Sequence, residues 1–68
     1  MKNHQQKLGQ TIRHLREERD LLQRELADRA GIPVRTLGRI ERGEVDLRLS
    51  TLRKIAGALQ VDIKDLLT

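Results

Sequence analysis

The sequence contains no cysteine, phenylalanine, tyrosine or tryptophan. Without cysteine it has neither disulfides nor a thiolate metal site, and nothing argues for an oxidising compartment. Single-stranded nucleic acids and RNA loops are usually held by bases stacked on aromatic rings, so the missing rings disfavour those partners. No apolar run is long enough to span a membrane, and the polar stretch from Met1 to Lys7 excludes a signal peptide. We therefore expect a cytoplasmic protein without membrane contact.

Positive charge is what the chain has in surplus. Fourteen basic residues against ten acidic ones give a formal net charge of +4 and a pI near 10.4. Such a balance favours a polyanionic partner, and duplex DNA fits the aromatic-free composition better than a single strand does. The 68 residues are expected to form one small domain, 1–68, in which residues 1–6 are a polar arm or the start of a helix.

Apolar residues recur at helical spacing along the whole chain, and no strand pattern appears. The expected helices run from an N-cap at Asn3 to about Arg19, from Gln23 to the turn residue Gly31, from Pro33 to just before Gly43, from about Arg48 to Leu59, and from an N-cap at Asp62 through Leu67. Among the residues expected to face inward are Leu22, Leu26, Ala27, Ala30, Leu37, Ile40, Leu49, Leu52, Ile55, Ala56 and Leu59.

The first expected helix carries opposite charges at i, i+4 spacing, in the pairs Arg13/Glu17, His14/Glu18 and Arg16/Asp20. A membrane-surface helix would show a basic polar face, whereas this face alternates in sign. The segment is therefore interpreted as a solvated amphipathic helix.

The expected helix after Pro33 is the richest in arginine. With Leu37 and Ile40 facing the core, steps of 100° per residue place Arg35 and Arg42 within about 10° of the outward pole and Arg39 within about 50°. Gly38 is also expected to point outward, where its small size would allow close approach to another surface. A charge cluster of this kind is most often only a solvated surface. Here the preceding short helix and Gly38 favour a binding surface.

These residues carry a resemblance to a known family. The segment from about Leu8 to Leu67, with the motifs LAxxAG, IERG and IAxAL, closely resembles the Xre family of helix-turn-helix domains, of the Cro and phage-repressor type. The resemblance implies a compact, all-α, five-helix, lambda-repressor-like domain whose second and third helices form the helix-turn-helix. It also implies a transcription regulator, by the family's commoner habit a repressor, that binds a two-fold operator in double-stranded DNA as a homodimer, at least on DNA, with helix 3 in the major groove.

The resemblance also implies roles for individual residues. Val34, Arg35 and Arg39 match base-contacting positions, where an arginine can donate twice to guanine and a valine can pack on a thymine methyl; either arginine could instead bind phosphate. Residues expected at the DNA backbone are Gln23, Arg24, Thr36, Arg42 and Arg48. Arg16 and Glu41 match an internal ion pair between helix 1 and the end of helix 3, which would account for a carboxylate beside three arginines.

Four positions depart from the family's usual residues: Leu22, Pro33, Leu47 and Gln60. Leu22 and Pro33 remove hydroxyls that could cap a helix or touch a phosphate, and Leu47 fits either the core or an exposed contact surface.

Rival functions remain open on the sequence alone. An antitoxin or other protein-interaction module with an unidentified protein partner can be built on the same fold, and the chain could also be the DNA-binding piece of a longer repressor. An enzyme is not expected, because His4 and His14 lack metal-ligand spacing and Thr36, Ser50 and Thr51 lack a catalytic constellation in sequence. No cofactor or metal is expected.

Overall fold

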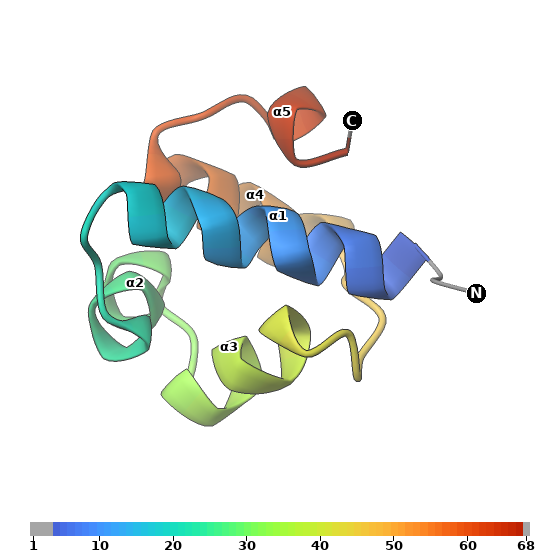
Figure 1. Cartoon of the computed structure of the whole chain (residues 1–68), viewed down its shortest axis with the longest axis horizontal. Helices are drawn as coiled ribbons and strands as arrows, with labels where there is room; N and C mark the ends of the chain where they lie inside the picture. Colours follow the sequence, from blue (N-terminus) through green and yellow to red (C-terminus); the bar gives the residue numbers. More distant parts are fainter. Residues whose placement is uncertain (1–3, 68) are drawn as a thin grey trace.

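The computed structural model describes residues 4–67, and the expected cap at Asn3 lies outside this range. Within it the chain forms five α-helices and no strand (Figure 1): α1 His4–Glu18, α2 Gln23–Ala30, α3 Val34–Glu41, α4 Leu49–Leu59 and α5 Ile63–Leu67. The predicted all-α, five-helix architecture is confirmed. Residues 4–6 are the start of α1.

The helices pack around one apolar cluster. α2 packs against α4 and α3, α1 packs against α3, and α5 contacts both α1 and α4. The buried side chains come from all five helices: Ile12, Leu26, Ala27, Ala30, Leu37, Ile40, Leu52, Ile55, Ala56, Leu59 and Leu66. Burying a leucine or isoleucine side chain contributes about 1.5–3 kcal/mol, so this cluster fixes where α3 lies on the molecule.

The α2–α3 turn is the centre of the helix-turn-helix. Gly31 adopts φ +70°, and the N–H of Ile32 donates to the carbonyl of Ala27 at 3.0 Å, which ends α2 as predicted. Pro33 was expected as the first residue of α3, but its ψ of 142° is extended and the helix begins at Val34. Arg48 likewise precedes α4, which begins at Leu49. Both helices therefore start one residue later than predicted.

Two glycines let α1 lie directly on the end of α3. A Cβ on Gly9 would stand 2.4 Å from the carbonyl oxygen of Ile40, so no side chain fits at this position of α1. Gly43 ends α3 with φ +73°, and a Cβ there would stand 2.7 Å from the Cα of Gln6. The backbones of the two helices consequently meet without intervening side chains, which leaves little freedom in the position of the end of α3.

Two leucines expected in the core are exposed. Leu22 and Leu49 each keep 57% of their surface accessible, whereas Leu21 is buried. Leu22 and Leu26 share a face only if both are helical, and Leu22 has an extended backbone, so the helical period does not apply to it. Leu49 is the first residue of α4 and lies on the same side of that helix as Leu52. A residue in the first turn is buried only where another element covers that turn. Leu47 is partly buried and packs against the core.

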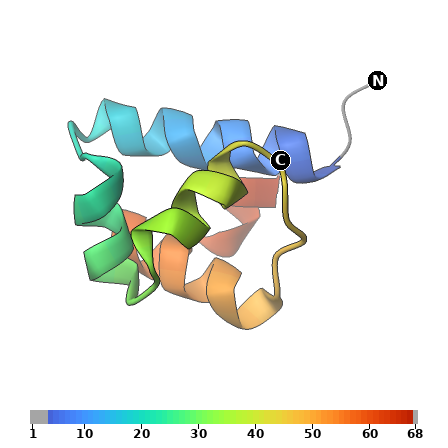
Figure 2. The ribbon, with the colours of Figure 1, turned by 90° about the horizontal axis from the view of Figure 1, so that it is seen from below.

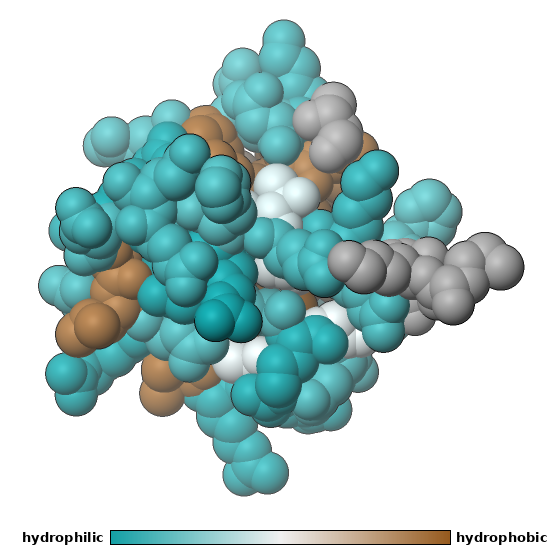
Figure 3. Space-filling view, in the orientation of Figure 1, coloured by the Kyte–Doolittle hydropathy of each residue, from teal (hydrophilic) through white to brown (hydrophobic). Residues whose placement is uncertain are grey.

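No helix among residues 4–67 has the length and apolar character to cross a membrane. The face in Figure 3 is mostly hydrophilic, with small separate hydrophobic patches.

Candidate nucleic-acid interface

The outward face of α3 presents the residues predicted to contact bases. Val34 is 46% exposed and Arg35 and Arg39 are exposed. Arg35 and Arg39 are one helical turn apart, so their side chains leave the same face of α3. Figure 2 looks onto the side of the molecule where α2 and α3 lie, with α1 along the upper edge. Two guanidinium groups and one apolar side chain are therefore presented together.

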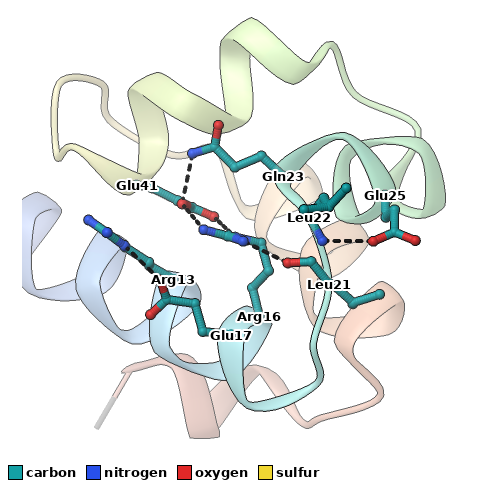
Figure 4. Close-up of polar contacts among 8 residues, drawn as sticks. All are labelled: Arg13, Arg16, Glu17, Leu21, Leu22, Gln23, Glu25 and Glu41. Atoms are coloured by element: carbon teal, nitrogen blue, oxygen red, sulfur yellow. Dashed lines mark hydrogen bonds and ion pairs between the residues drawn. The ribbon is translucent and has the colours of Figure 1, made fainter.

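Glu41, on the opposite side of the same helix, accepts hydrogen bonds from two other helices (Figure 4). Arg16 of α1 donates from Nε to Oε2 at 2.8 Å and from Nη2 to Oε1 at 3.2 Å. Gln23 of α2 donates from Nε2 to Oε1 at 2.9 Å. The side chains of Arg16 and Glu41 keep only 11% and 2% of their surface exposed. The structure thus brings together the pair that the resemblance implied and adds Gln23 to it.

Arg16 also fixes the connection into α2. Its Nη1 donates to the carbonyl oxygen of Leu21 at 2.6 Å, so one guanidinium binds both the α1–α2 connection and α3. The spacing-based pair of Arg16 with Asp20 does not form, because Asp20 lies beyond the end of α1 with φ +55°. The pairs Arg13/Glu17 and His14/Glu18 do form, at 3.3 and 3.2 Å.

Gly38 is buried, contrary to the expectation that it points outward. A Cβ at this position would stand 3.3 Å from Nη1 of Arg42 and 3.7 Å from Oε1 of Gln23, so these two side chains cover it. Gly38 therefore lies beneath these two side chains and does not face a potential binding partner directly.

The remaining residues predicted at the DNA backbone come from the start of α2, from α3 and its end, and from the residue before α4. Arg24, Arg42 and Arg48 are exposed, whereas Gln23 and Thr36 are partly buried. Leu22 supplies no capping oxygen, but its own N–H donates to Oε1 of Glu25 at 2.8 Å, so one half of a capping box closes the start of α2.

Glu44, which no sequence pattern marks as a site residue, pairs with two arginines of this face. Its Oε2 accepts from Nε of Arg42 at 2.5 Å, and its Oε1 lies 3.8 Å from Nε of Arg39. The hydrogen bond from Arg42 lowers the pKa of the Glu44 carboxyl, and the same bond raises the pKa of Arg42. The i, i+2 spacing of Arg42 and Glu44 is not a helical pairing, and only the turn at Gly43 brings them together.

In this arrangement the buried side of α3 is held by the core and by Glu41, and its exposed side is cationic. A model of the family described as Helix-turn-helix matches residues 12–66, which contain α2, the turn at Gly31 and α3. The chain belongs to the helix-turn-helix family.

A phage repressor and a bacterial transcriptional regulator are similar to most of this chain. It is 41% identical to the immunity repressor protein of Bacillus phage phi105 over 56 residues, which are 82% of the chain and 39% of the repressor. It is 38% identical to the HTH-type transcriptional regulator DdrOP3 of Deinococcus deserti over 61 residues, 90% of the chain and 47% of that regulator. The chain spans less than half the length of both relatives.

Solved structures of the same fold match more completely. The restriction-modification controller protein C.AhdI of Aeromonas hydrophila superposes with a TM-score of 0.88 at 34% identity, covering 90% of this chain and 92% of that one. The clp gene regulator ClgR of Corynebacterium glutamicum superposes with a TM-score of 0.93 at 25% identity, covering 98% of this chain and 87% of that one.

Proposed function

We propose that this helix-turn-helix chain is the sequence-specific DNA-binding unit of a transcription regulator, a repressor that inserts α3 into the major groove of duplex DNA. One observation carries the proposal: Val34, Arg35 and Arg39 share an exposed face of a helix whose opposite side is fixed by Leu37, Ile40 and Glu41. Relatives that are named as a repressor and as a transcriptional regulator support the same function.

The chemistry of the face suits a groove. A guanidinium can donate two hydrogen bonds to O6 and N7 of guanine, which discriminates against other bases by about 1–3 kcal/mol, and Val34 offers a methyl-sized contact for thymine. Around them Arg24, Arg42, Arg48, Gln23 and Thr36 would bind the phosphate backbone and set the orientation of α3. Gln23 keeps a second N–H on Nε2 for this purpose while it donates the first to Glu41.

The direct test begins with selection of bound sequences from a random pool of DNA duplexes. Arg35→Ala and Arg39→Ala are then measured on the selected operator and on a random duplex. Loss of a base contact should weaken operator binding by about tenfold or more while random-duplex binding falls far less, because phosphate contacts dominate the latter. Arg53→Ala, which removes an exposed arginine from α4, serves as the matched control and should change neither strongly.

Two results would contradict the assignments. Equal losses on operator and random duplex would place Arg35 and Arg39 on phosphates. Duplex affinity that does not fall with added salt would contradict DNA binding itself, since neutralised phosphates release counterions.

We further propose that two copies bind a two-fold operator, one α3 in each half-site. The proposal rests on the family's symmetric docking geometry and on Leu67, which leaves 62% of its surface exposed on α5.

A further inference from the structure

Glu44 contacts two of the three outward-facing arginines of α3 and its end. It meets Arg42 along one edge of the guanidinium, through Nε at 2.5 Å and Nη2 at 3.5 Å. It lies 3.8 Å from Nε of Arg39. Arg35 forms no ion pair with any residue in the range 4–67. The negative charge of Glu44 is therefore directed at Arg39 and Arg42.

The backbone fixes this carboxylate at the end of α3. The N–H of Glu44 donates to the carbonyl of Arg39 at 3.0 Å, and the N–H of Gly43 donates to that of Ile40 at 3.0 Å. Gly43 has φ +73° and packs against Gln6 of α1. Glu44 is thus attached to a tight helix end, so its carboxylate stands next to the arginines before any ligand arrives.

The fold has little need of this charge. The side chain of Glu44 is 46% exposed, and those of Arg39 and Arg42 are 51% and 60% exposed. Exposed ion pairs contribute little to stability. A carboxylate binds a guanidinium with the same geometry as a phosphate does, so Glu44 competes with DNA phosphates for the same donors.

The two arginines are held differently. Glu44 faces the Nε side of Arg39, which leaves the two terminal Nη groups of that guanidinium for a base edge. Arg42 is bound through Nε and Nη2 and must give up these bonds to turn fully onto a phosphate. The competition at Arg42 weakens phosphate binding on any duplex, whereas only an operator offers bases to the oriented Arg39, and this gain offsets the loss there.

We propose that Glu44 is a specificity-determining residue, an internal counter-ion that keeps Arg42 and Arg39 from indiscriminate phosphate binding while orienting Arg39 toward bases. This inference rests on the proposed function. It predicts that Glu44 weakens binding to random duplex more than binding to the operator.

The test compares the unmodified chain with Glu44→Gln on operator and random duplex over a series of salt concentrations. Glu44→Gln should bind random duplex about threefold or more tightly and with a salt slope steeper by about one ion, because the released arginine binds one more phosphate. Its operator affinity should change by less than about twofold. Glu17→Gln, the same substitution in an exposed Arg–Glu pair on α1, controls for net charge and should change neither.

A second set of variants tests whether the effect acts through Arg42. In an Arg42→Gln background, Glu44→Gln should increase random-duplex affinity appreciably less than it does alone. An equal increase in both backgrounds would overturn the pairing as the cause. If the unmodified chain binds duplex and Glu44→Gln matches it in affinity and slope, the inference fails while the proposed function stands. If the unmodified chain binds no duplex, both fail.

Discussion

At the scale of single residues, Glu41 separates two roles that the sequence places side by side. It sits between Ile40 and Arg42 in a run with two outward arginines, yet its carboxylate is almost fully buried against Arg16 and Gln23. No buried polar side-chain atom within residues 4–67 lacks a hydrogen-bond partner. The buried charge is therefore matched inside the fold.

Because the pair is buried, removing one partner should be costly. We expect Glu41→Gln to lower the free energy of unfolding by about 3 kcal/mol, since it leaves the Arg16 guanidinium buried without its counter-charge. Glu17→Gln, which breaks the exposed pair with Arg13, should cost less than about 0.5 kcal/mol. Urea denaturation followed by circular dichroism measures both.

A double-mutant cycle with Arg16→Met identifies the cause. The losses of unfolding free energy in Glu41→Gln and Arg16→Met, added together, should exceed the loss in the double variant by at least about 1 kcal/mol. Additive losses would show that Arg16 and Glu41 do not stabilise each other.

At the scale of helices, two glycines in two helices differ in whether the structure leaves room for a side chain. Gly9 lies where α1 meets the end of α3, and a Cβ there would overlap the backbone of Ile40. Gly57 is an exposed interior residue of α4, and a Cβ there would meet nothing within 4 Å. The same substitution should therefore have opposite effects in the two helices.

We expect Gly57→Ala to raise the free energy of unfolding by about 1 kcal/mol through helix propensity. Gly9→Ala should lower it by about 2 kcal/mol or more, because α1 must move away from α3. Thermal and urea denaturation of both variants measure the difference. Equal stabilisation by both would mean that the backbones of α1 and α3 are not in close contact.

Periodicity predicted which segments are helical because each helix carries an apolar stripe that only the core can cover. The same periodicity predicted burial wrongly where the backbone is not helical, and where side chains from elsewhere cover an outward position. Leu22 is extended rather than helical, and Gly38 is covered by side chains of Gln23 and Arg42 that no spacing rule locates. In the candidate site, the outward position of the arginines could be predicted from the rotation of 100° per residue along α3. The pairing of Glu44 could not, because it depends on the turn at Gly43.

At the scale of the whole molecule, the proposed operator complex needs two copies of this chain. Leu67→Gln should weaken binding to a palindromic operator by about tenfold, since it removes apolar area of the order that one buried leucine supplies. Binding to an isolated half-site should stay the same. Lys64→Gln changes an exposed residue of the same helix and serves as the control.

Sedimentation of the free chain and of the operator complex completes this test. Two chains per palindromic operator are expected. A monomer in both states would contradict the dimer, and an equal loss for Leu67→Gln on palindrome and half-site would place Leu67 outside the contact between copies.

The contact of α5 with both α1 and α4 has a consequence for synthesis. Leu66 is 1% exposed in a core that also contains Ile12, so the core is complete only after residue 66 has left the ribosome. Helices form locally within about a microsecond, whereas translation adds about 5–20 residues per second. The arginine-bearing α3 and its neighbours α1 and α2 are therefore made before α4 and α5 complete the core that all five helices share, and a nascent chain should hold α3 stably in place only after synthesis of α5.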